Sequence, residues 1–392
     1  MRHFPCYASL LLALLLTGCQ SSNYASQHLQ KPQLNSAPFA KPQQEVASVD
    51  EIFTLDANDL TDLKAEMRSG ATSQDKTRAL LRFIFKSDQL PLHYVNSATL
   101  VAHETLQRRE ANCLSLTILA YALAKEVGFN AEFHEVQIPE YWITDGHQSR
   151  LNGHVNLLVV PPVLSFENGA VNYSLSRITV DFDTENRGKA WPSRVVTKED
   201  IVAMFYNNKA ADSLVAADYA QAFAYLKAAV EIAPNSAQTW ANLSVLYRQV
   251  GLYKDAEESY LFSLRLNPNN SNTMANLAVL YRLVGQTAKA IELEEVVARK
   301  RKLNPFYHLM LGDEALNAQQ TDIAKIHFNQ ALRLNPSLSA AMFGMAKSYI
   351  IEGDIDKAAQ YLQDAKHFSQ SHDEKLRYES KLKILQQVAV LY

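Results

Sequence analysis

A repeat of 34 residues in the second half of the chain restricts its fold more than any other feature. Five alanines stand 34 residues apart: Ala222, Ala256, Ala290, Ala324 and Ala358. Glycine recurs at one place in the same register, with a glutamine in the missing position: Gly251, Gly285, Gln319 and Gly353. A fixed period of this length indicates stacked copies of one helical hairpin, each covering the hydrophobic face of its neighbour.

The repeat resembles the tetratricopeptide family, in which alanine lets two helices cross closely, glycine ends helix A and proline follows helix B. The third copy is irregular, because Pro305 falls three residues late and the basic run 299–302 lengthens its second helix. That basic run is interpreted as a solvated helix end rather than a binding patch. We expect about five repeats over residues 201–371 and a capping helix over residues 372–392.

Stacked helix pairs form an extended concave groove that usually binds peptides or partner proteins. Asn208, Asn242 and Asn276 recur at one position in three consecutive first helices. An amide ladder can hydrogen-bond an extended peptide backbone without reading its side chains. The arrangement is similar to the asparagine ladders of superhelical tetratricopeptide arrays. Structural hydrogen bonding between repeats is the alternative, and the sequence does not decide between them.

The N-terminus has the pattern of a secretory signal peptide over residues 1–18. Arg2 precedes a nine-residue stretch from Ala8 to Leu16 that is apolar apart from one serine and too short to span a membrane. The following Thr17-Gly18-Cys19 completes a motif that resembles the lipobox of bacterial lipoproteins. The resemblance implies cleavage before Cys19, acylation of that residue and, because Gln20 follows it, the outer membrane. A plain secretory peptide is the alternative.

Residues 19–48 comprise the lipidated cysteine and a segment rich in Ser, Gln, Asn, Ala and Pro. Such a composition predicts a flexible tether, and roughly 30 residues of it span about 30 Å. We expect it to act only as a spacer between the membrane and the folded body.

After this processing Cys113 is the one remaining thiol of an exported protein, so it cannot form an internal disulfide. The apolar positions of residues 113–127 surround a helix, which indicates burial in a core. Asn112 suits the N-cap and Gly128 the left-handed position that ends the helix. Cys113 then lies in the first turn, where unpaired N–H groups favour a thiolate. It is therefore a candidate nucleophile.

Three strands are predicted after this helix, over residues 130–139, 153–160 and 178–183. His154 opens the second strand, and Asp181 lies inside the third. A histidine and an aspartate so placed can face the helix N-terminus together, as base and orienting carboxylate for the thiol.

This order of Cys113, His154 and Asp181 resembles the transglutaminase-like domain of the papain-like cysteine enzymes. The resemblance covers residues 49–200 and implies an α+β domain followed by the all-α tetratricopeptide solenoid. It also implies that His154 accepts the thiol proton, that Asp181 holds the imidazole, and that the thiolate attacks an amide carbonyl. Many members carry a Trp two residues after the histidine, whereas Asn156 stands here.

Two details of this site stay open at the sequence level. Asp183 competes with Asp181, because strand alternation puts both on one face. The Cys113 backbone N–H is one oxyanion donor, and Tyr94 and Asn96 are polar candidates near the second.

Other kinds of site receive little support. His134, His147 and His154 have no compact metal-ligand spacing, so no metal and no cofactor are expected. A formal net charge of -3 does not favour nucleic acid as a partner. Beyond the signal peptide, no apolar run approaches the ~18 residues of a membrane span.

Two functions follow from these patterns. The first is an envelope lipoprotein of the outer membrane, facing the periplasm, with a Cys-His-Asp thiol site for amide hydrolysis or acyl transfer on a peptide or protein recruited by the repeat groove. The second is a non-catalytic envelope scaffold whose repeats bind partners and whose transglutaminase-like domain is a degenerate recognition module.

Overall fold

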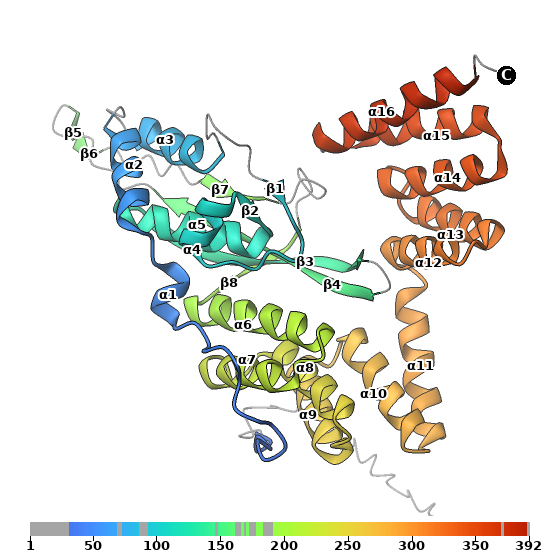
Figure 1. Ribbon diagram of the computed structural model, residues 1–392, viewed down its shortest axis with the longest axis horizontal. Coiled ribbons are helices and arrows are strands. Elements are labelled where there is room, and N and C mark those ends of the chain that lie inside the picture. The colour runs from blue at the N-terminus through green and yellow to red at the C-terminus, as the bar shows by residue number, and fades with distance from the viewer. Residues whose placement is uncertain are drawn as a thin grey trace, which may run out of the picture.

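The computed structural model describes residues 31–68, 73–85, 93–145, 148–160, 166–167, 170–171, 178–182, 191–369 and 372–389. Cys19, Asp183 and His147 lie outside these residues, as do the predicted signal peptide and the start of the predicted tether. Helices and strands make up the N-terminal part of the molecule, and a stack of helix pairs follows (Figure 1).

The N-terminal part consists of short helices around a four-stranded sheet. Its helices are α1 (Val49–Phe53), α2 (Ala57–Met67), α3 (Ser73–Phe85), α4 (Ala102–Arg108) and α5 (Cys113–Glu126). The sheet is antiparallel, in the order β7-β4-β3-β8, and its strands are β7 (Ile178–Val180), β4 (Gln148–Val160), β3 (Asn130–Asp145) and β8 (Ser193–Val196). Two-residue pairs are formed by β1 (His93–Tyr94) with β2 (Glu110–Ala111) and by β5 (Phe166–Glu167) with β6 (Ala170–Val171).

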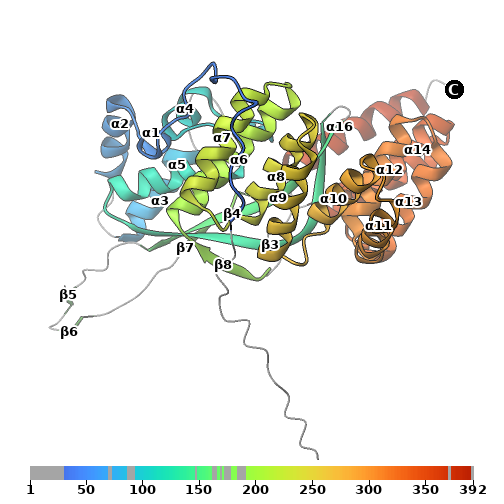
Figure 2. The same cartoon turned by 90° about the horizontal axis from the view of Figure 1, so that it is seen from below.

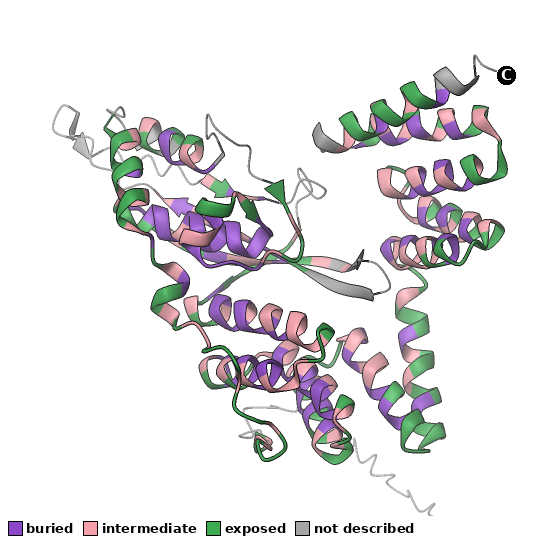
Figure 3. Cartoon of the chain, in the orientation of Figure 1, coloured by how far each residue is buried: buried purple, intermediate pink, exposed green. Residues whose placement is uncertain are grey.

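Helix α5 is the centre of this part and confirms the sequence prediction. It begins at Cys113 with Asn112 as its N-cap, and Gly128 beyond its end has a φ of +76°. Eleven of its 14 residues are buried (Figure 3). Helices α1, α3, α4 and α6 (Lys198–Val215) and strands β2, β3 and β4 all contact it. The apolar character all around this helix is therefore matched by neighbours on all sides.

The β3–β4 hairpin is longer than predicted. The two strands pair from Asn130↔Val160 to Asp145↔Gln148, with an irregularity between Val136 and Tyr141. The predicted strands 130–139 and 153–160 are thus only the base of this hairpin. Its far half projects from the sheet, and β3 contacts α12, the helix Pro305–Asn317 (Figure 1). Proline and glycine usually end or interrupt a strand. Pro139 and Gly153 therefore made the predicted strands too short.

Ten helices form five pairs, and one more helix covers the last pair. They are α6 (Lys198–Val215), α7 (Tyr219–Ile232), α8 (Ala237–Gln249), α9 (Tyr253–Leu266), α10 (Ser271–Leu283), α11 (Thr287–Arg301), α12 (Pro305–Asn317), α13 (Thr321–Leu334), α14 (Ser339–Glu352), α15 (Ile355–Phe368) and α16 (His372–Ala389). Helix α16 contacts α15 and buries Tyr378 completely, as a capping helix does. The array begins at Lys198, three residues before the predicted boundary.

The repeat positions have the roles that the pattern predicted. All five alanines of the 34-residue series are fully buried. Positive φ angles occur at the turn of every helix pair: Ala217 (+56°), Gly251 (+79°), Gly285 (+77°), Gln319 (+60°) and Gly353 (+81°). Three of the five turns use glycine, for which this conformation carries no steric cost.

The hydrophobic core is interrupted between the third and fourth helix pairs. One cluster runs continuously from Ile52 in the N-terminal part to Ala290 in α11, and another begins at Phe306 in α12. Helix α11 is mostly exposed and buries only Ala290 and Val297. It ends at Arg301, one residue beyond the register of the other second helices. The predicted irregularity of the third repeat therefore divides the array into two blocks, α6–α11 and α12–α16.

Residues 31–48 are not a free tether over the part that is described, because they lie on the first repeats (Figure 2). The ring of Phe39 stacks on Phe223 of α7 with centroids 4.3 Å apart. The backbone N–H of Asn35 donates to the Tyr247 hydroxyl over 2.9 Å, and burial raises the pKa of Tyr247 to about 12. The polar composition of this segment predicted a flexible tether. Local composition contains no information about a docking surface more than 170 residues away in the sequence.

Phe328 of α13 lies between two glycines, Gly312 of α12 and Gly344 of α14. A Cβ at residue 344 would stand 2.5 Å from the Phe328 ring. Gly344→Ala should therefore lower the free energy of unfolding by about 1–3 kcal/mol through overpacking. In a helix interior without such a close contact, the same change would instead raise the free energy of unfolding by ~0.5–1 kcal/mol. Urea unfolding of both proteins measures the difference.

The matched control removes the ring. In a Phe328→Ala background, Gly344→Ala should become neutral or stabilising, because no ring atom opposes the new methyl group. An equal loss of stability in both backgrounds would show that contact with Phe328 is not the reason for glycine at this position.

Candidate functional site

A buried amide fixes the start of α5. The Asn112 side-chain oxygen accepts the Ser115 backbone N–H over 2.9 Å, which is the N-cap hydrogen bond. Its Nδ2 donates to Thr99 Oγ1 over 2.8 Å and to the Asn96 carbonyl oxygen over 3.3 Å. Asn96, predicted as a polar candidate for the oxyanion, thus supplies a backbone acceptor to the helix cap. This network holds Cys113, the next residue, in place.

Cys113 occupies the first turn of α5, as predicted, and is a free thiol with 8% of its surface exposed. Its Sγ lies 3.8 Å from the carbonyl oxygen of Gly153 in β4. The first turn of a helix has backbone N–H groups without helical acceptors and the positive end of the macrodipole. The sulfur is thus beside both a helix N-terminus and the strand that carries His154.

His154 and Asp181 form a close pair, with 3.0 Å between Nε2 and Oδ1. His154 is in the interior of β4, opposite Val136, rather than at the start of a strand. Asp181 directly follows β7, which is shorter than predicted. Leu157 of β4 pairs with Val180 of β7. Extending this register by one residue places Asp181 diagonal to His154, and diagonal neighbours on one face of a sheet can touch.

The pair is enclosed on its histidine side and open on its carboxylate side. The His154 side chain is 2% exposed and that of Asp181 is 33% exposed. The Cys113 thiol hydrogen-bonds the backbone carbonyl of Gly153. The structure therefore brings imidazole and carboxylate into contact and places the sulfur next to the residue that precedes His154. Whether these side chains act as a catalytic triad stays a prediction.

The structure also describes the other predicted residues of this region. Tyr94 in β1 is about half exposed. Asn156, two residues after His154, is half-buried and pairs across the sheet with His134. His134 lies 3.4 Å from the Ser193 hydroxyl. Within the described ranges, no three His, Cys, Asp or Glu side chains are grouped so as to hold a metal ion.

The recurring asparagines of the first helices are half-buried. Asn242 Nδ2 donates to Asn207 Oδ1 over 2.9 Å, a hydrogen bond between repeats. Asn276 Nδ2 donates to the Asn272 carbonyl of its own helix over 3.1 Å. Asn207 was not predicted, because it stands one residue before Asn208 and outside the 34-residue series.

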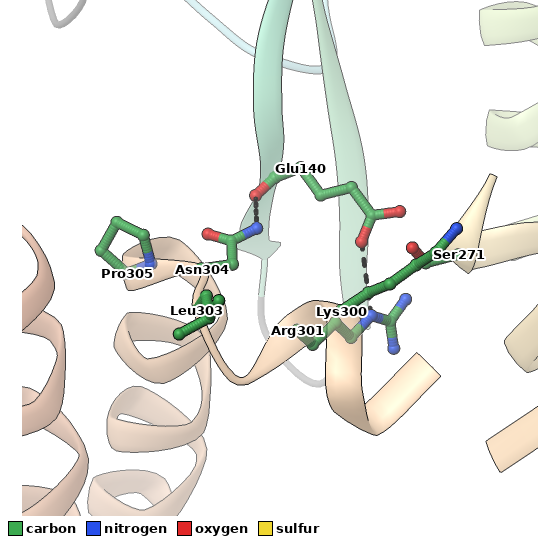
Figure 4. Close-up of a pocket in the computed structure, with 7 residues that line it drawn as sticks. All are labelled: Glu140, Ser271, Lys300, Arg301, Leu303, Asn304 and Pro305. Atoms are coloured by element: carbon green, nitrogen blue, oxygen red, sulfur yellow. Dashed lines mark hydrogen bonds and ion pairs between the residues drawn. The ribbon is translucent and has the colours of Figure 1, made fainter. Parts of the chain in front are cut away.

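The hairpin contacts the repeats where the two blocks meet (Figure 4). Glu140 of β3 accepts through its carbonyl oxygen from Asn304 Nδ2 over 2.7 Å, and its carboxylate lies 3.3 Å from Arg301 Nε. A cavity of about 280 Å³ beside this contact is also lined by Ser271, Lys300, Leu303 and Pro305. The Arg301 side chain is only 13% exposed, so the prediction of a solvated end to the basic run is wrong at this residue. Sequence could not reveal a pairing 161 residues apart.

Comparison with known proteins supports the repeats. Tetratricopeptide repeat family models match residues 237–270, 260–292 and 309–372. The chain therefore contains tetratricopeptide repeats, a module of protein–protein interaction. None of the curated proteins matches the chain. Among the helices that the structure describes, none has the length and hydrophobicity of a membrane-spanning segment.

Three solved structures illustrate the similarity. YrrB, described as a TPR protein with an unusual peptide-binding site, is 20% identical, with 47% of this chain and 94% of that one covered and a TM-score of 0.25. PilF of Pseudomonas aeruginosa is 22% identical, with 49% and 87% covered and a TM-score of 0.27. MamA of Desulfovibrio magneticus RS-1 is 18% identical, with 44% and 97% covered and a TM-score of 0.25.

The network at the start of α5 gives a stability prediction. Asn112→Ala should lower the free energy of unfolding by about 2 kcal/mol or more, because it removes the cap and leaves the buried Thr99 hydroxyl without its donor. Asn270→Ala is the matched control, since Asn270 caps α10 through the Thr273 N–H. It should cost about 1 kcal/mol. Urea unfolding measures both values, and equal losses would mean that the Nδ2 hydrogen bonds contribute nothing.

Proposed function

We propose that this protein is a membrane-anchored envelope lipoprotein that performs amide hydrolysis or acyl transfer on a peptide or protein substrate with Cys113 as its nucleophile. The observation that carries the proposal is the 3.0 Å contact of His154 with Asp181. His154 belongs to the strand against which the first turn of the Cys113 helix lies. We propose that residues 49–200 have the transglutaminase-like α+β fold. The support is the buried central helix and the order in which Cys113, His154 and Asp181 follow one another along the chain.

Asp181 beside Nε2 favours the imidazole tautomer with its proton on that nitrogen, which leaves Nδ1 as the base. The Cys113 thiol exchanges its hydrogen bond from the Gly153 carbonyl to Nδ1 and loses its proton there. The thiolate then forms a bond to the amide carbon, and the imidazolium returns the proton to the amine that leaves. Water or a second amine attacks the resulting thioester, gives the acid or the new amide, and restores the thiol. Unpaired N–H groups of the first turn of α5 stabilise the oxyanion.

The repeats supply the recruiting surface in this proposal. Asn208, Asn242 and Asn276 face the substrate or partner from successive first helices, and the hydrogen bond of Asn242 to Asn207 sets the angle of its amide. The Glu140 contact supports a link between recruitment and chemistry, because Glu140 lies in β3, and β3 pairs directly with the strand of His154.

The proposed anchor is Cys19, acylated after removal of residues 1–18, in the outer membrane and facing the periplasm. The docking of residues 31–48 on the first repeats supports a short connection. Only about 12 residues, at most roughly 40 Å of chain, then separate the anchor from the body.

The alternative is a non-catalytic envelope scaffold, in which the repeats bind partners and the thiol domain is a recognition module. Two observations favour it. The Cys113 thiol hydrogen-bonds the backbone carbonyl of Gly153, and Asn156 replaces the family's Trp.

Thiol labelling separates the two functions. An unperturbed thiol, with a pKa near ~8.5, is only about 0.3% thiolate at pH 6, whereas a His-paired thiol is largely ionised there. We expect iodoacetamide to modify Cys113 about 10–100-fold faster than glutathione at pH 6, as followed by mass spectrometry. His154→Ala should abolish this advantage, and Asp181→Asn should reduce it.

His134→Ala is the matched control, because His134 lies on the neighbouring strand but faces Ser193. It should leave the labelling rate unchanged. If Cys113 labels no faster than glutathione and is insensitive to His154→Ala, the catalytic proposal fails and the scaffold remains.

The anchor has its own test. The intact protein should incorporate a radiolabelled fatty acid and sediment with membranes, because several acyl chains bind a bilayer far more firmly than one. Cys19→Ala should lose the label and appear in the soluble periplasmic fraction. Membrane sedimentation of an unlabelled Cys19→Ala protein would exclude lipidation as the anchor.

A further inference from the structure

Two contacts hold the first turn of α5 against β4, and they flank His154. Cys113 Sγ lies 3.8 Å from the carbonyl oxygen of Gly153. One helical turn later, Thr117 Oγ1 lies 3.4 Å from the carbonyl oxygen of Val155. The helix therefore touches the strand at the residue before His154 and at the residue after it.

The two contacts are separated by nearly the same distance along the helix and along the strand. Cys113 and Thr117 are about 6 Å apart along the helix axis, since each residue rises about 1.5 Å. Gly153 and Val155 are about 6.7 Å apart along the strand. The two contacts can thus form together at one alignment of helix and strand. A shift of the helix by one residue would move the sulfur by about 1.5 Å relative to His154.

The hydroxyl of Thr117 contacts both the helix and the strand. Thr117 is fully buried, and its Oγ1 also lies 2.8 Å from the Cys113 carbonyl oxygen. One O–H proton is therefore shared between the backbone of Cys113 and the backbone of Val155. A sulfur is a weak hydrogen-bonding group by comparison. This hydroxyl joins the residue that carries the thiol to the strand that carries the imidazole.

We propose that Thr117 is a positioning residue that sets the distance between the Cys113 sulfur and the His154 ring. The inference rests on the proposed function of Cys113, and Thr117 itself touches no substrate. Without the hydroxyl, α5 loses its contact with the Val155 carbonyl, and the sulfur can shift relative to the His154 ring. A misplacement of about 1 Å can cost roughly 100-fold in rate.

Thr105 provides a matched control for the loss of a buried threonine hydroxyl. It is fully buried in α4, and its Oγ1 donates to the Val101 carbonyl oxygen four residues earlier, over 2.9 Å. Thr117 makes the same bond within its helix, but adds the contact with Val155. Comparing the two residues isolates the link between α5 and β4.

The experiment records the rate at which iodoacetamide modifies Cys113 from pH 5 to 9 in the full chain, together with the melting temperature. Thr117→Val keeps the side-chain volume and removes the hydroxyl. We expect it to slow labelling at pH 6 by roughly 10–100-fold and to move the midpoint of the pH profile upward, toward the ~8.5 of a free thiol. Thr117→Ser should keep the rate and profile of the unaltered protein. Thr105→Val should also keep them, whatever stability it loses.

An unchanged rate and pH profile in Thr117→Val would overturn the inference, and so would a Thr117→Ser protein as slow as Thr117→Val. If Thr117→Val does not fold, Thr117→Ala and Thr117→Ser differ by the hydroxyl and give the same test. Slow labelling of the unaltered protein, with no effect of His154→Ala, marks the different case in which the proposed function itself fails and the positioning role falls with it.

Discussion

The burial of one helix on all sides is the constraint on which this structure depends. Helix α5 is contacted by four helices and three strands, and one of those helices is α6, the first of the repeats. The core of the N-terminal part therefore continues without a break into the array as far as Ala290. Because Cys113 begins this helix, a buried and closely packed element carries the one free thiol of the described residues.

The array is joined to the N-terminal part at three places that are far apart in sequence. Helix α6 packs on α5, residues 31–48 lie on α7 and α8, and Glu140 reaches Arg301 and Asn304 between the two blocks. The last contact lies where the hydrophobic core is interrupted, so a polar contact from another part of the chain bridges the two blocks where apolar stacking stops. The repeats and the N-terminal part are thus connected by contacts that lie far apart in the sequence.

Much of the site could be predicted, but not its geometry. The head of the buried helix, its cap at Asn112 and the glycine at its end are set by local preferences for capping and left-handed φ, and these predictions are confirmed. The positions of His154 and Asp181 within their strands were wrong, because strand ends depend on pairing partners rather than on local signals. The contact between these two side chains depends on the register of β4 with β7, which no local pattern encodes.

The sequence by itself determined the repeat architecture and the place of the thiol on its helix. A period of 34 residues with a small residue at each crossing leaves few ways to bury the apolar faces. The tertiary structure alone decided which distant groups meet: Glu140 with Arg301, residues 31–48 with the first repeats, and Thr117 with the strand of His154. Hydrophobic periodicity is a property of neighbours along the chain, whereas these contacts depend on how the finished elements pack against one another in space.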